Sequence, residues 1–187
     1  MAATPFVNDV VRLIETTMKT QVSNVKEREE LRKKILRNMQ EYKDRIAAAN
    51  RQSKATNDRR IEALEKAEGI AQHELKRGHP FVAHLNKAID LFQAVARPVP
   101  YGSLDKAMDA VEDWDVASEN NASLKNASKY LQEEDKLFVS ASAGIEKREQ
   151  AAKAMVSTVV KDLQSVDNPD VKRKVQVFID EIVYKIK

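Results

Sequence analysis

The chain has 187 residues, of which 42% are hydrophobic and 33% are charged, with four glycines, five prolines and a formal net charge of +3. This balance is typical of long, solvent-exposed helices with narrow apolar stripes, and it predicts an all-α protein with one domain over 1–187. Because the chain contains no cysteine, disulfide bridges, thiolate nucleophiles and cysteine metal ligands are excluded.

The hydropathy pattern does not predict an export signal or a membrane-spanning helix. The amino terminus lacks a basic segment followed by an apolar one, and the sequence nowhere has the roughly 18 consecutive apolar residues that a membrane helix needs. We therefore expect a cytoplasmic protein.

The first segment, from Val7 to Ala49, has apolar side chains at the alternating spacing of four and three residues that lets one helix lie against another. We call such a stripe an apolar seam. Thr4 and Pro5 provide a good helix start, so we expect one long helix over about 5–50. The residues of this seam are Val7, Val11, Ile14, Met18, Val25, Ile35, Met39, Tyr42, Ile46 and Ala49.

The seam is lost in segment 51–58, which has no apolar seam residue and several side chains that favour helix caps. Beyond it, the apolar positions return one residue out of phase, so the helix either breaks here or continues through a stutter. We favour a break, followed by a helix over about 58–77 that Gly78 and Pro80 terminate.

Four more helices are expected, over about 80–96, 103–118, 122–165 and 169–187. The third of them carries a second seam that matches the first in length, which favours antiparallel pairing of the two. The predicted fold is thus an elongated helical bundle built on two long antiparallel coiled-coil-like helices, braced by shorter helices. The last helix is amphipathic, and its apolar face could contact lipid or another subunit, or complete the core. The residues of that face are Val171, Val175, Phe178, Ile182 and Ile186.

Four charged residues interrupt the two seams. A buried unpaired charge costs several kcal/mol, so each must find a partner, extend to solvent or lie where the bundle opens. These residues are Arg28, Arg32, Glu134 and Arg148.

The sequence does not predict a metal, cofactor or catalytic site. His73 and Glu74 resemble the start of a zinc-protease helix, but Arg77 stands where the second histidine is required. The acidic group around Asp105 and Asp109 lacks the glycine-punctuated loop of a calcium site. Since there is also no phosphate-binding loop, dinucleotide turn or nucleophile elbow, we expect a protein that is not an enzyme and has no evident small-molecule substrate.

Basic residues recur every seven positions beside the first seam and form what we call the basic stripe. Such a stripe could contact nucleic acid or an anionic membrane, although acidic neighbours and the lack of interleaved aromatic residues weaken the nucleic-acid interpretation. The basic stripe consists of four residues at this spacing, Arg12, Lys19, Lys26 and Lys33, and is extended by Lys34 and Arg37.

The favoured function is that of a structural or adaptor protein acting through helix-mediated self-assembly or through contact with another protein. The alternative is a membrane-active bundle whose amphipathic terminal helices bind anionic lipid, and the third hypothesis is nucleic-acid binding or packaging.

Overall fold

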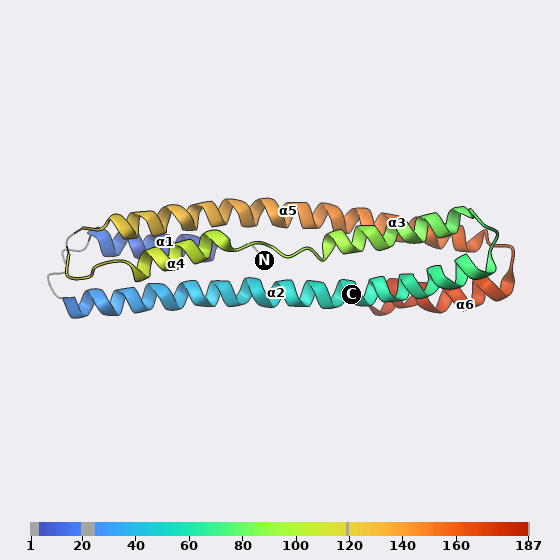
Figure 1. The fold of residues 1–187 in the computed structure, drawn as a ribbon, viewed down its shortest axis with the longest axis horizontal. Helices are drawn as coiled ribbons and strands as arrows, with labels where there is room; N and C mark the ends of the chain where they lie inside the picture. The colour runs from blue at the N-terminus through green and yellow to red at the C-terminus, as the bar shows by residue number, and fades with distance from the viewer. Residues whose placement is uncertain (1–3, 20–24, 119, 187) are drawn as a thin grey trace. The chain divides into compact units, whose positions relative to one another are not determined.

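The computed structural model describes residues 4–19, 25–118 and 120–186. These residues form six α-helices, a π-helical turn and no strand, which confirms the all-α class (Figure 1). The elements are α1 (Thr4–Lys19), α2 (Val25–Glu74), α3 (Pro80–Val95), α4 (Gly102–Glu112), α5 (Ala122–Gln164), α6 (Pro169–Asp180) and η1 (Glu181–Lys185).

The chain divides into two compact units, each built from two separate segments. Unit 1 consists of Met1–Ala49 and Val99–Ser142, and unit 2 of Asn50–Pro98 and Ala143–Lys187. Each unit therefore takes a part of α2 and a part of α5. The expectation of one domain stays a prediction.

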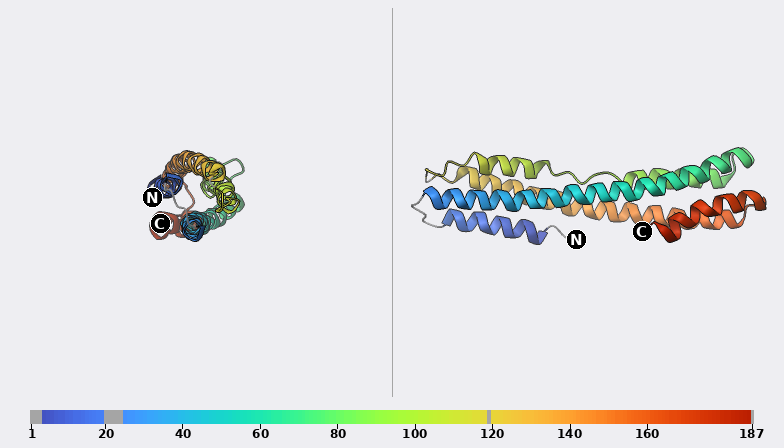
Figure 2. Two further views of the ribbon diagram at one scale, coloured as in Figure 1. Left: turned by 90° about the vertical axis from the view of Figure 1, so that its left-hand side faces the viewer. Right: turned by 90° about the horizontal axis from the view of Figure 1, so that it is seen from below.

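In unit 1, α1 folds back along α2, so the expectation of one helix over 5–50 is wrong (Figure 2). The Phe6 ring stacks on the Tyr42 ring with 5.5 Å between their centroids. At 1.5 Å per residue, a single helix would place these two residues about 54 Å apart. The apolar seam predicted a single helix because its residues in α1 and its residues in α2 keep the same heptad phase. Segment 20–24 lies outside the described residues.

Within unit 1, α2 and α5 run in the same direction, so the expected antiparallel pairing is also wrong (Figure 1). Arg28 near the start of α2 bonds the segment just before α5, whereas Tyr42 farther along α2 meets Phe138 farther along α5. In this unit α4 takes the antiparallel position, since Asp105 near its start pairs with Lys43 and Trp114 after its end meets Arg32.

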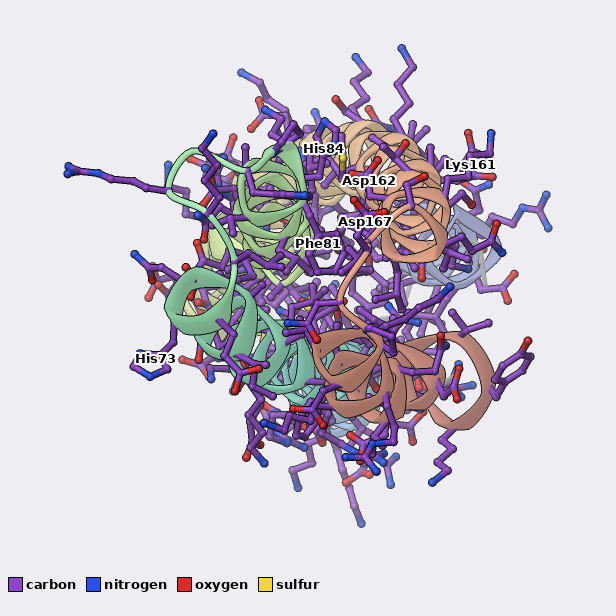
Figure 3. All side chains as sticks on the ribbon, turned by 90° about the vertical axis from the view of Figure 1, so that its right-hand side faces the viewer. His73, Phe81, His84, Lys161, Asp162 and Asp167 are labelled. Atoms are coloured by element: carbon purple, nitrogen blue, oxygen red, sulfur yellow. The ribbon has the colours of Figure 1, made fainter. Side chains whose placement is uncertain are left out.

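In unit 2, the second parts of α2 and α5 surround a hydrophobic core together with α3 and α6–η1. Phe81, Leu85 and Ile179 are fully buried in it, and Figure 3 shows Phe81 pointing inward. The apolar face predicted for the last helix closes this core. Four of its residues, Val171, Val175, Ile182 and Ile186, are buried, and Phe178 is partly buried.

The expected helix break at 51–58 is absent, because α2 continues to Glu74. Polar side chains of segment 51–58 form hydrogen bonds and an ion pair within the helix. The side-chain amide of Asn57 donates to the Ser53 carbonyl at 2.8 Å, and Lys54 pairs with Asp58 one turn later. Beyond the helix, Gly78 has a φ of 81°, a left-handed conformation that favours glycine, and α3 begins at Pro80 as expected.

Candidate functional site

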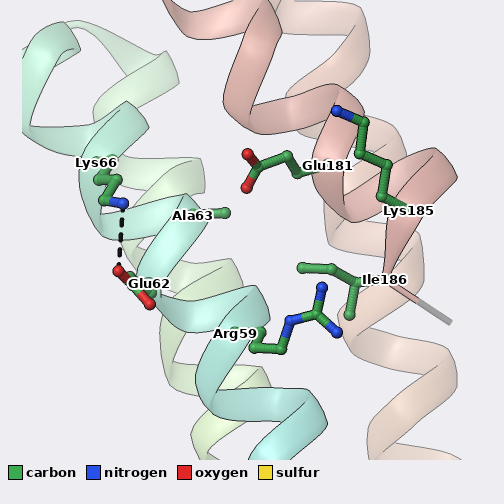
Figure 4. Close-up of a pocket in the computed structure, with 7 residues that line it drawn as sticks. All are labelled: Arg59, Glu62, Ala63, Lys66, Glu181, Lys185 and Ile186. Atoms are coloured by element: carbon green, nitrogen blue, oxygen red, sulfur yellow. Dashed lines mark ion pairs between the residues drawn. The ribbon is translucent and has the colours of Figure 1, made fainter.

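Two cavities lie in unit 2 on either side of the end of α6–η1. The smaller, of about 190 Å³, has mainly charged walls (Figure 4). Lys66 on one wall pairs with Glu62 at 3.2 Å and also lies over the Phe178 ring, 5.9 Å from its centroid. The residues around this cavity are Arg59, Glu62, Ala63, Lys66, Glu181, Lys185 and Ile186.

The larger cavity, of about 410 Å³, is lined by both polar and apolar side chains. We call it the Arg60 cavity. Its polar side is formed by Arg60, Glu149, Lys153 and Ser157, and its apolar side by Phe92, Val156, Ile182, Val183 and Ile186.

Arg60 is only 6% exposed, which is rare for an arginine, and it is held by three contacts. One Nη donates to the Asn57 side-chain oxygen at 3.0 Å and lies 3.4 Å from a Glu149 carboxylate oxygen. The guanidinium carbon lies 5.2 Å from the centroid of the Phe92 ring, a cation–π contact. Glu149 is also 3.7 Å from the Lys153 ammonium.

The π-helical turn η1 shapes both cavities. Its hydrogen bond runs from the Ile186 amide to the Glu181 carbonyl at 2.9 Å, five residues back, and Ile186 borders both cavities. Such wide turns are rare and often occur at functional sites. Sequence analysis missed them because neither the π-turn nor the cavities leave a periodic signal.

Three large apolar side chains of α6–η1 are exposed, namely Val177, Val183 and Tyr184, at 57%, 42% and 71%. Val183 also lines the Arg60 cavity, so it does not share the face of the other two. We call Val177 and Tyr184 the α6–η1 outer face. Val177 and Tyr184 are seven residues apart, which places them on one side of a helix. The sequence analysis singled out the opposite, buried face of this helix, so it missed these residues.

Unit 1 contains a buried carboxylate where no partner was foreseen. Glu134 is fully buried near the backbone amides of Ser103 and Leu104 at the start of α4, and neither of its carboxylate oxygens has a hydrogen-bond partner among the described residues. Burial raises the pKa of Glu134 and outweighs these amides, which lower it, while Asp105 adds to the increase. The pKa of the Tyr42 hydroxyl is also raised, first by burial and then by the charges of Glu134 and Asp135.

The arginines that interrupt the first seam bind the segment after α4. Arg28 donates to the carbonyls of Val116 and Ser118 at 3.0 and 3.2 Å, and Arg32 donates to that of Trp114 at 2.8 Å. α4 ends at Glu112, earlier than the expected 118. The two arginines therefore satisfy carbonyls of the segment that follows the shorter helix.

In unit 2, Arg148 interrupts the second seam and folds back over Gly144. A Cβ at Gly144 would lie 3.4 Å from one Nη of Arg148. The buried Nε of Arg148 has no hydrogen-bond partner among the described residues.

The basic stripe does not form on one helix. Arg12 lies on α1, and Lys19 is the last residue of α1, with its side chain outside the described residues. The remaining four residues lie on α2 with exposed side chains, and Lys33 pairs with Glu30 at 3.6 Å. The α2 part of the stripe consists of Lys26, Lys33, Lys34 and Arg37.

The histidines and the acidic group make separate contacts. Figure 3 shows His84 beside Asp162, with which it pairs, and His73 away on the outside of α2. His79 accepts a hydrogen bond from the Phe81 amide at 3.1 Å, and Asp105 pairs with Lys43 at 2.7 Å. Within the described ranges, no three His, Cys, Asp or Glu side chains are grouped closely enough to hold a metal ion.

In a comparison with known proteins, no family model, no curated protein and no solved structure matches the chain. Among the helices that the structure describes, none combines the length and the apolar character needed to cross a membrane.

Proposed function

We propose that this chain is a structural or adaptor protein that is not an enzyme, works in the cytoplasm and associates with a second copy of itself through the α6–η1 outer face. The observation that carries the proposal is the exposure of Val177 and Tyr184 on a helix whose opposite face is already buried in unit 2. Large apolar side chains gathered on one exposed face are typical of protein interaction sites.

The chemistry around this face suits a protein partner. Tyrosine and arginine are enriched in interfaces, and the exposed Arg173 lies one helical turn before Val177 on the same side. Arg173 pairs with the exposed Asp170, which would remain at the polar rim. Self-association would bury Val177 and Tyr184 without disturbing the core of unit 2.

The membrane alternative has weaker support because the apolar face it needs lies in the core of unit 2. Val171 and Val175 are fully buried there. Burial of each such side chain stabilises the folded unit by about 1.5–3 kcal/mol. Detaching α6 from the core so that it could bind lipid would first lose this free energy for several side chains. The nucleic-acid hypothesis retains only the part of the basic stripe on α2.

Sedimentation velocity over a wide concentration range tests self-association. We expect the wild type to form dimers at high concentration, and Val177→Glu and Tyr184→Glu to stay monomeric because a buried charge opposes the contact. The matched control is Leu137→Glu, at an apolar residue of unit 1 that is 47% exposed, and it should dimerise like the wild type. A wild type that stays monomeric at every concentration, or a control that loses dimers equally, would contradict the proposal.

A further inference from the structure

The buried guanidinium in the Arg60 cavity is incompletely neutralised. Its distance of 3.4 Å to the Glu149 carboxylate is longer than the 2.7–2.9 Å of a strong charge-assisted hydrogen bond. Glu149 is also shared with Lys153. Two cations therefore face one carboxylate on this wall, which leaves room for a further negative charge.

The other wall of the cavity requires a hydrocarbon. Val156, Ile182 and Ile186 are buried side chains whose surfaces line it, beside the ring of Phe92. Its volume of about 410 Å³ is within the range of pockets that hold small molecules. A small polar anion would leave this wall uncovered, and a plain hydrocarbon would leave the Arg60 charge unsatisfied.

We propose that the Arg60 cavity binds a medium-chain carboxylate, with its carboxylate on Arg60 and its chain against Val156, Ile182 and Ile186. The planar guanidinium matches a carboxylate in shape and can donate two parallel hydrogen bonds to it. Asn57 and Phe92 already hold Arg60 in place, so binding does not have to order a free side chain. The Lys153 ammonium adds attraction at the polar end of the cavity.

Isothermal titration calorimetry of the full chain tests this binding with three probes that share one tail, namely decanoate, decanol and decyltrimethylammonium. All are used as monomers below their micelle concentrations. We expect decanoate to bind at least about tenfold more tightly than decanol, a difference of 1.4 kcal/mol that one charge-assisted pair can supply. The cationic probe should bind least. Equal binding of decanoate and decanol, or no binding of decanoate, overturns the proposal.

Variants locate the site. Arg60→Gln should weaken decanoate at least about tenfold and leave decanol nearly unchanged, because it removes the charge and keeps the apolar wall. The matched control is Arg59→Gln, since the neighbouring Arg59 lines the smaller cavity instead. If the control weakens decanoate as much as Arg60→Gln does, the proposal is wrong.

A second variant does not depend on removing the buried arginine. Ser157 is exposed at the wall of the cavity, so Ser157→Trp can fill the space without altering the core. It should abolish binding of both decanoate and decanol while circular dichroism shows an unchanged helix content. Undiminished decanoate binding in this folded variant excludes the cavity as the site.

Discussion

Neutralising the buried carboxylate of Glu134 should stabilise unit 1 at neutral pH. Glu134→Gln keeps the shape of the side chain and one oxygen that can accept from the amides of Ser103 and Leu104. It removes a charge that is fully buried. A buried polar group without a hydrogen-bond partner costs about 1–3 kcal/mol, and more when it is charged. Because the glutamine amide also needs partners, we expect a gain of about 1 kcal/mol in the free energy of unfolding.

The effect must depend on pH in a defined direction. The pKa of Glu134 is raised in the folded state above its ordinary value of 4.5. A raised pKa gives stability that is fully present below the unfolded pKa and is lost as the pH rises through the folded pKa. The advantage of Glu134→Gln should therefore be largest at pH values above the folded pKa and shrink as the pH falls toward 4.5.

The assay is urea unfolding followed by the fluorescence of Trp114. This is the only tryptophan of the chain and is buried in unit 1, so its signal reports on that unit. Glu133→Gln serves as the control, because Glu133 is exposed and its neutralisation should change stability by less than about 0.5 kcal/mol. A Glu134→Gln variant less stable than the wild type at neutral pH would refute the reasoning, as would an advantage that does not change with pH.

Four further substitutions test other contacts. Arg28→Ala and Arg32→Ala should each cost about 1–2 kcal/mol, because they leave carbonyls after α4 unpaired, and the Trp114 fluorescence should report the loss. An unchanged unfolding midpoint in both would show that water replaces these bonds. Gly78→Ala should cost about 1 kcal/mol by circular dichroism, since φ there is 81°. Leu85→Ala should lose about 3 kcal/mol by the same measurement, and a loss below about 1 kcal/mol would speak against its close packing.

The sequence was sufficient to predict many of the buried apolar positions. Ile35 and Met39 of the first seam are fully buried, as their spacing indicates, whereas Val25 and Ala49 of the same seam are exposed. Helical periodicity reports burial because a side chain on the inner face recurs every three or four residues. Periodicity does not report the direction of a helix, so the same pattern fits parallel and antiparallel helices. It also does not report where a helix ends when the next helix keeps the same phase, and for this reason Val7–Ala49 looked like one helix.

The Arg60 cavity could not be predicted from the sequence because the residues that line it lie far apart along the chain. Arg60 follows segment 51–58, where the sequence predicted a helix break, but both belong to α2. Its partner Glu149 lies on α5, far away in the sequence. Glu134 was recognised as an anomaly in the second seam. Its neighbours, the amides of Ser103 and Leu104, are backbone groups that every residue type possesses, so no residue pattern could identify them.

The division of each unit into two separate segments determines how the chain can be cut. Because the segments alternate along the chain, one break in the loop between α3 and α4 divides both units at once. Neither resulting fragment contains a whole unit, and reassociation of the two would have to restore both hydrophobic cores together. During synthesis, unit 1 can close once Ser142 is available, whereas unit 2 must wait for the last helix. Loss of the carboxyl-terminal residues would thus remove part of a core rather than an appendage.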